Sequence, residues 1–199
     1  ESSTGSAISL SSATTVMLSV SAGTMALLDI AMQSVIPGGR LTTESGVPIS
    51  TSDRTAQSTL YYTPFVHNTV PLWDGAQWKP LKFTETSLAL SGLTSGKPYD
   101  VFGYLNSGVL ALELLVWTSD TARATAVTLQ DGRYCKSGDK TRLLLGTIYT
   151  TGTTTTEDSA ASRLLANVYN RAIRHLALST GEQLHTYATF SYRAFNNNT

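Results

Sequence analysis

The sequence predicts a mainly β protein, built as an antiparallel β-sandwich or jelly-roll-like module with one α-helix near its C-terminal side. Two observations predict the sheets. Apolar and polar residues alternate in short runs, and turns rich in Gly, Asn, Asp and Ser separate these runs about every eight to twelve residues. A third observation predicts the helix, because apolar residues recur at helical spacing after residue 157.

The amino-acid composition indicates which classes of binding partner are not expected. The 199 residues carry a formal net charge of zero and only 14% charged residues, against roughly 25% in an ordinary soluble domain. Ser, Thr, Gly and Asn therefore supply the surface polarity. We expect no nucleic-acid partner, since no basic stripe is present. The longest apolar-looking stretch, residues 24–37, is interrupted by Asp29, Gln33 and Ser34 and is shorter than the roughly 20 residues that span a bilayer. We therefore expect no membrane insertion.

The predicted fold is organised around a β-hairpin over residues 99–117. An alternating run is interrupted by a polar turn over residues 106–108, and an apolar run resumes at Val109. Two such runs around a short turn that contains glycine are typical of a hairpin. Apolar residues stand on both faces of the second strand, so we expect it to be covered on both sides. The cover is either a second sheet of a monomeric sandwich or a neighbouring copy of the chain.

The remaining elements follow from the same alternation. Strands are expected within residues 8–10, 15–20, 40–49, 59–66, 70–83 (as a hairpin around Asp74-Gly75), 86–93, 125–129, 132–136, 142–150 and 186–195. Residues 25–32 fit a strand or a short helix, and a strand is favoured. Residues 50–58 are hydrophilic, and a linker or loop is expected there. The predicted organisation is an N-terminal β or attachment segment (1–37), the main β module with its helix (38–175), and the start of a further β segment or an interdomain linker (176–199).

The helix is predicted to begin at Asp158 and end at Arg171. A run of threonines precedes it, and Glu157 and Asp158 would place negative charge at its N-terminus, where the helix dipole favours it. Arg171 and Arg174 would complement its C-terminal end.

The number and spacing of the cysteine and histidine residues give no indication of a metal or cofactor site. Cys135 is the only cysteine, so no disulfide can form within the chain, and we expect an inert, structural thiol. His67, His175 and His185 lie far apart in the sequence and show no metal-binding spacing. We expect no metal and no cofactor.

Several segments in fixed order resemble a structural module of tailed-bacteriophage virion proteins. They are GGRLTTESGVPIS, LYYTPFV, LWDGAQWK, PYDVFGYLNSGVLALELLVWTSDTARATAVTLQDGRYCKSG, RLLLGTIYTTGTTTTEDS and NVYNRAIR, and they cover residues 38–174. The resemblance implies a non-enzymatic particle component, exposed on the virion and assembled as a homotrimer. Its partners would be itself, other virion proteins and a host surface glycan. A tail-fibre or host-adhesion protein is the first expectation, and a capsid decoration or head-fibre protein is the alternative.

An enzyme is not expected, because no catalytic constellation is evident. A glycan-cleaving site would need a pair of carboxylates. The candidates are Asp74, Glu85, Asp100, Glu113, Asp120 and Asp131. Asp74 and Asp131 precede turn glycines, which explains them without chemistry. Glu113 is flanked by leucines on a strand that we expect to be covered, and an arginine across an interface is its expected partner.

A carbohydrate-binding module is the second alternative function. Tyr61, Tyr62, Trp73 and Trp78 would form an aromatic platform for a sugar if they share an exposed face, with Asp74 accepting hydrogen bonds from hydroxyl groups. In the competing interpretation, the tryptophans that flank the turn pair across the strands and pack into the core.

Overall fold

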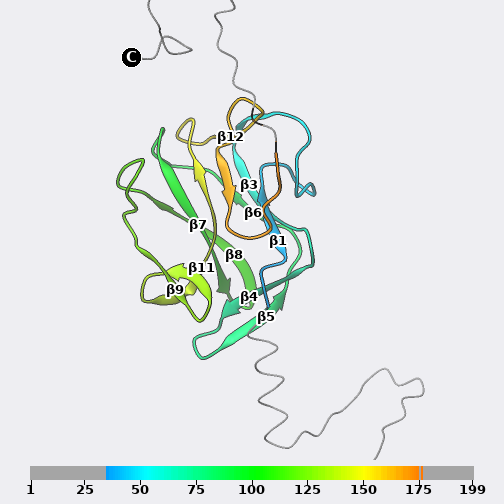
Figure 1. The fold of residues 1–199 in the computed structure, drawn as a ribbon, viewed down its shortest axis with the longest axis vertical. Coiled ribbons are helices and arrows are strands. Elements are labelled where there is room, and N and C mark those ends of the chain that lie inside the picture. Colours follow the sequence, from blue (N-terminus) through cyan, green and yellow to red (C-terminus); the bar gives the residue numbers. More distant parts are fainter. Residues whose placement is uncertain (1–34, 175, 177–199) are drawn as a thin grey trace, which may run out of the picture.

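The computed structural model describes residues 35–174 and residue 176, and within this part the chain is mainly antiparallel β and contains no helix (Figure 1). The strands are β1 (Gly39–Thr42), β2 (Arg54–Gln57), β3 (Thr59–Pro64), β4 (Thr69–Trp73), β5 (Trp78–Lys82), β6 (Thr86–Ala89), β7 (Pro98–Asn106), β8 (Val109–Val116), β9 (Val127–Gln130), β10 (Arg133–Lys136), β11 (Asp139–Tyr149), β12 (Thr156–Asp158) and β13 (Leu165–Asn167). The mainly antiparallel β prediction is confirmed.

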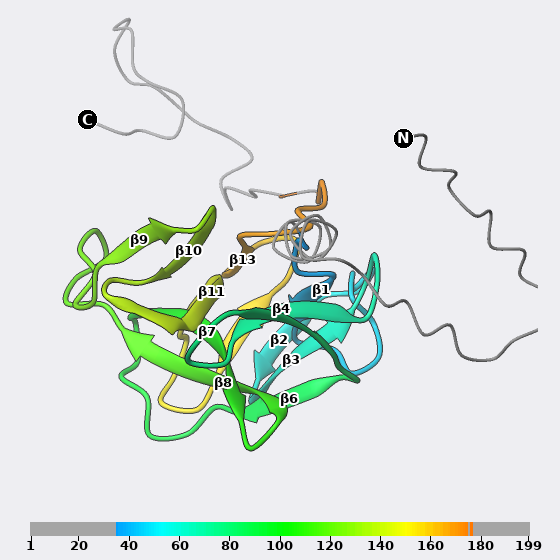
Figure 2. The same cartoon turned by 90° about the horizontal axis from the view of Figure 1, so that it is seen from below.

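These strands form one large sheet and three smaller ones. The six-stranded sheet has the order β8-β7-β11-β10-β9, with β13 also paired to β11. A three-stranded sheet has the order β1-β3-β6, and β12-β2 and β4-β5 are two-stranded. In Figure 2 the β9 and β10 hairpin lies at one side of the module, and β1, β3 and β6 lie at the other. Strand β2 falls in residues 50–58, so the expectation of a plain loop there is wrong: its backbone pairs with β12.

The predicted hairpin over residues 99–117 is confirmed as β7 and β8. The two strands pair from Tyr99 with Val116 to Asn106 with Val109. The two turn residues, Ser107 and Gly108, both have positive φ angles, 50° and 87°. That pair of conformations is typical of the tight turns whose twist matches a hairpin.

A single apolar core joins the three-stranded and six-stranded sheets. The fully buried residues include Leu41, Leu60 and Tyr62 of the smaller sheet, and Val101, Leu143, Leu145 and Ile148 of the larger one. Cys135 is 0% exposed within the same core. Because both sheets contribute side chains to one cluster, burial of apolar surface holds them together without a disulfide.

The predicted helix from Asp158 to Arg171 is wrong. Asp158 ends strand β12, a tight turn follows in which Ser159 and Ser162 exchange backbone hydrogen bonds, and the chain then continues as strand β13. Strand β13 completes the free edge of β11, where Gly146 pairs with Asn167 and Ile148 with Leu165. The backbone hydrogen bonds of this segment therefore go to a neighbouring strand, and tertiary pairing outweighs the helical spacing of its apolar residues.

Gly146 is the residue that lets β13 approach β11. A Cβ atom at Gly146 would lie 2.3 Å from the carbonyl oxygen of Ala166 and 2.7 Å from a methyl group of Leu41. A side chain has no room there. The close backbone approach therefore depends on glycine at this position.

The strands expected within residues 1–34 and 186–195 lie outside the described residues, as do most of the predicted N-terminal and C-terminal segments. In residues 35–174 and 176, no helix has the length and apolar character needed to cross a membrane.

Candidate functional site

The β4–β5 hairpin brings Trp73, Asp74 and Trp78 together at one end of the module. Trp73 and Trp78 are directly paired across the two strands. Their rings meet edge to face, with centroids 5.6 Å apart and planes inclined by 69°. Trp78 is only 5% exposed and belongs to the core. This is the cross-strand pairing expected in the competing interpretation.

The carboxylate of Asp74 makes its contacts within the β4–β5 hairpin. Its Oδ1 accepts hydrogen bonds from the backbone N–H groups of Ala76 and Gln77, each at 2.9 Å. Its Oδ2 lies 2.5 Å from the Nζ of Lys79. The hydrogen bond from Lys79, followed by those from the two amides, holds the pKa of the Asp74 carboxyl well below its usual range. Both oxygens of Asp74 are therefore committed to the hairpin.

Basic side chains cover the tryptophan pair. The Nζ of Lys140 lies 4.7 Å from the centroid of the Trp73 ring, and the Cζ of Arg133 lies 4.7 Å from the centroid of Trp78. Asp131 links β5 to β11, because its Oδ2 accepts from the Nε1 of Trp78 at 3.0 Å and lies 2.6 Å from the Nζ of Lys140. These cation–π contacts and hydrogen bonds account for the tryptophans without a ligand.

Tyr61 and Tyr62 do not join the tryptophans in an exposed platform. They lie on β3, in a different sheet, and successive side chains of a strand point to opposite faces. Tyr62 is 1% exposed and stacks on Phe83, with ring centroids 5.1 Å apart. Burial raises the pKa of its hydroxyl above the ordinary value. Since Tyr62 and Trp78 are both buried, the predicted platform of Tyr61, Tyr62, Trp73, Asp74 and Trp78 is corrected: it cannot stack a sugar as a unit.

Most of the other carboxylates considered from the sequence make structural contacts. The Oδ2 of Asp100 lies 2.6 Å from the Nε of Arg123. Glu113 does pair with an arginine, but the partner is Arg142 of the same chain, whose Nε lies 2.5 Å away. This corrects the expectation of a partner across an interface.

Glu85 gathers three hydrogen bonds. It accepts from the hydroxyls of Ser45 and Thr63 and from the N–H of Gly46, each at 2.6 Å. Burial opposes ionisation of Glu85, but the three hydrogen bonds outweigh it, and the pKa lies below the ordinary value. Glu85 thereby ties the loop after β1 to strand β3.

Two further kinds of site were considered among the described residues, a metal site and a reactive thiol. Residues 35–174 and 176 hold no group of three or more His, Cys, Asp or Glu side chains placed to bind a metal ion. Burial raises the pKa of the Cys135 thiol to about 11. At neutral pH this thiol is protonated and enclosed in the core, which matches the inert role expected of it.

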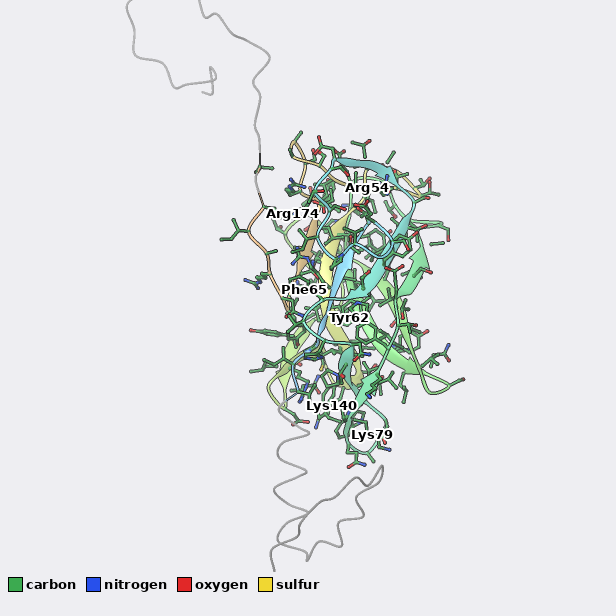
Figure 3. All side chains as sticks on the ribbon, turned by 90° about the vertical axis from the view of Figure 1, so that its right-hand side faces the viewer. Arg54, Tyr62, Phe65, Lys79, Lys140 and Arg174 are labelled. Carbon is green, nitrogen blue, oxygen red and sulfur yellow. The ribbon has the colours of Figure 1, made fainter. Side chains whose placement is uncertain are left out.

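The second candidate site is a pocket of about 410 Å³, which we call the arginine pocket. Its charged lining consists of Arg40, Asp158, Arg163, Arg171 and Arg174. Its other lining residues are Leu165, Ala166, Asn167 and Ala172. Arg174 lies toward one end of the module, whereas Lys79 and Lys140 of the aromatic hairpin lie toward the other (Figure 3).

Two asparagines position this pocket by joining its wall to strand β1. Asn167 of β13 accepts a hydrogen bond from the N–H of Leu41 at 2.7 Å and donates to the carbonyl of Leu41 at 3.1 Å. Asn170 has a positive φ of 53° and donates to the carbonyls of Pro37 and Gly39. Residues far apart in the sequence are thus brought to either side of Arg40.

The arginine pocket was not predicted from the sequence. Arginine recurs at positions 163, 171 and 174, but the predicted helix places Arg171 and Arg174 at its C-terminal end and not in a pocket. Arg40 lies more than a hundred positions away, and only the contact between β1 and the segment after β12 brings it to the other three.

Comparison of the chain with protein-family models, with curated proteins and with solved structures found no match.

Proposed function

We propose that this chain is a non-enzymatic structural component of a tailed-bacteriophage particle, which acts by assembly and by contact with surfaces. A tail-fibre or host-adhesion protein, assembled as a homotrimer and exposed on the virion, is the first form of the proposal. A capsid decoration or head-fibre protein is the second. In either form the module would be of the β-sandwich type, which the core shared by its three-stranded and six-stranded sheets supports.

The observation that carries the proposal is an exposed apolar pair on the outermost hairpin of the large sheet. Leu129 of β9 and Tyr134 of β10 are direct cross-strand partners. They are 62% and 48% exposed. Strand β9 is the last strand of the sheet order, so its outer edge is unpaired within the described residues. An exposed edge with apolar side chains is a surface on which another chain can pair or pack.

Two exposed apolar side chains also stand on β8, the strand at the opposite edge of the same sheet, one at each end of the strand. Val109 and Val116 of β8 are 62% and 40% exposed. With β8 at one end of the sheet order and β9 at the other, both edges offer surface to neighbours. A module with two such edges suits an assembly in which each copy contacts two others.

The assembly is tested by light scattering on the purified full-length chain. We expect the mass of a trimer at micromolar concentration, and a monomer mass for the double variant L129K/Y134K. The matched control is T128K, which adds one positive charge to the exposed neighbouring position on the same strand and should leave the trimer intact. A monomer mass for the unsubstituted chain at high micromolar concentration would refute the homotrimer.

The place on the particle is tested by antibody-gold labelling of the intact virion, viewed by electron microscopy. Gold at the tail tip or along tail fibres would support the host-adhesion form. Gold distributed over the head would support the decoration or head-fibre form instead. Particles that carry no gold above the level of a pre-immune control would refute both.

A further inference from the structure

The arginine pocket holds more positive than negative charge. Four arginines line it, against the single carboxylate of Asp158. Both oxygens of that carboxylate are occupied, because Oδ1 lies 3.1 Å from the Nη1 of Arg163 and Oδ2 accepts from Arg174. Among the described residues, no carboxylate pairs with Arg40 or Arg171.

Arg40 is buried and, within residues 35–174 and 176, has no carboxylate partner of its own. It is 5% exposed, its Nη1 donates to the carbonyl of Asn170, and its buried Nε has no hydrogen-bond partner in the described part of the chain. Burial, with a smaller contribution from the positive charge of Arg174, lowers the pKa of Arg40, while Asp158 partly opposes this. A buried guanidinium without its own counter-charge is costly, and an anion in the pocket would offset that cost.

The lining and the volume of the pocket narrow the class of anion that it can hold. A guanidinium presents parallel N–H donors that match two oxygens of a carboxylate or of a phosphate. Besides its charged residues and Asn167, the pocket is lined by Leu165, Ala166 and Ala172, which suit the apolar face of a small ring. Its volume of about 410 Å³ falls within the range of sites for small organic ligands.

We propose that the arginine pocket binds the carboxylate-bearing sugar unit of an acidic polysaccharide, with Arg40 and Arg171 as the residues that receive the carboxylate. This inference rests on the proposed function, because it names the class of host surface glycan that the particle component contacts. It also replaces the aromatic platform expected from the sequence by a site at the other end of the module.

Isothermal titration calorimetry on the full-length chain tests this inference. The probes are glucuronate, galacturonate and N-acetylneuraminate, with the neutral sugars glucose and galactose and with inorganic phosphate. We expect saturable binding of at least one acidic sugar, weakened as salt is added, and no heat from the neutral sugars. The acidic sugar should bind at least about tenfold more tightly than phosphate, because the apolar part of the lining contributes only to a sugar ring.

The variant R171Q separates the pocket from general charge. Arg171 is exposed and its Nε donates only to the carbonyl of Asn167, so its replacement should leave the fold intact and weaken acidic-sugar binding about tenfold or more. The matched control is K82Q, which removes one positive charge from exposed Lys82 of β5, outside the pocket lining, and should bind as the parent does. R40M is the second variant, with its folded state checked by circular dichroism before titration.

The outcomes are distinct from those of the proposed function. Absence of binding by every acidic sugar, equal binding of phosphate, or unchanged binding by R171Q would each overturn the acidic-sugar site. None of these results would alter where gold labels the virion. Conversely, an unlabelled particle would refute the proposed function while leaving the titration result unchanged.

Discussion

The side-chain amide of Asn167 pairs with both backbone groups of Leu41, which joins β13 to β1 as a further strand residue would. Leu41 donates its N–H at 2.7 Å and accepts through its carbonyl at 3.1 Å. Leu41 is 1% exposed, so water cannot replace either hydrogen bond. One side chain therefore connects the three-stranded sheet to the large sheet at a place where no backbone ladder exists.

N167A should destabilise the protein by about 2 to 4 kcal/mol, because it leaves a buried donor and a buried acceptor unpaired. The measurement is the free energy of unfolding from urea titration. The control N68A removes an exposed asparagine from the loop between β3 and β4 and should change stability by less than about 0.5 kcal/mol. Equal stability of N167A and N68A would contradict the role given to Asn167.

G146A tests the close approach of β13 to β11. A methyl group at this position would lie 2.3 Å from the carbonyl oxygen of Ala166, so β13 must move away or the strand must distort. We expect a loss of about 1 to 3 kcal/mol and faster hydrogen exchange of the amides in residues 165–168. S87A, on the exposed side of β6, is the control. Unchanged exchange rates in G146A would show that the glycine is not required for this pairing.

The sequence predicts well those elements whose partner strand follows directly in the chain. The β7–β8 hairpin is formed by neighbouring segments. The alternation of its residues and the Ser107-Gly108 turn can both be recognised in the sequence. Likewise, the pairing of Trp73 with Trp78 follows from their positions on either side of one turn. Both pairings can be predicted without knowing which distant segments meet in the fold, and both are confirmed.

Segments whose partners are distant were predicted less well. Residues 158–171 have apolar residues at helical spacing, yet their structure is decided by β11 and by the Leu41 backbone, which the local sequence does not reveal. The same distant contacts create the arginine pocket from Arg40 and the segment after β12. The predicted platform was wrong for a related reason, since the burial of Tyr62 depends on Phe83 and on the packing of two sheets.

E85Q tests the pH dependence that the hydrogen bonds to Glu85 create. The pKa of Glu85 in the folded protein lies below its ordinary value of 4.5, so ionised Glu85 stabilises the fold above that pH. This stabilisation is lost as the pH falls through the lower folded-state pKa. E85Q should be less stable than the parent at pH 7 and should lose less stability between pH 5 and pH 3.

The measurement for E85Q is the thermal midpoint at a series of pH values. D120N removes an exposed carboxylate from the segment after β8 and serves as the control, with the same acid slope as the parent expected. If E85Q and the parent lost stability in parallel as the pH fell, the hydrogen bonds from Ser45, Gly46 and Thr63 would not depend on the ionised form of Glu85.

R123M tests the ion pair between buried Asp100 and exposed Arg123. Asp100 is 2% exposed and accepts from the Nε of Arg123 at 2.6 Å and from the hydroxyl of Thr147 at 2.9 Å. Removing Arg123 leaves a buried carboxylate with the hydroxyl as its remaining partner, which should cost about 1 to 3 kcal/mol. Arg123 also lies over the ring of Trp117, with its Cζ 4.3 Å from the centroid, so the tryptophan fluorescence should change as well.

The double variant D100L/R123M distinguishes the charge from the packing. If the cost of R123M comes from the unpaired carboxylate, replacing that carboxylate with an apolar side chain should recover most of the lost stability. The control K136M breaks the longer and more exposed pair of Lys136 with Asp139, at 3.9 Å, and should cost less than about 1 kcal/mol. If the double variant were no more stable than R123M, the contribution of Arg123 would lie in its contact with Trp117 and not in the charge of Asp100.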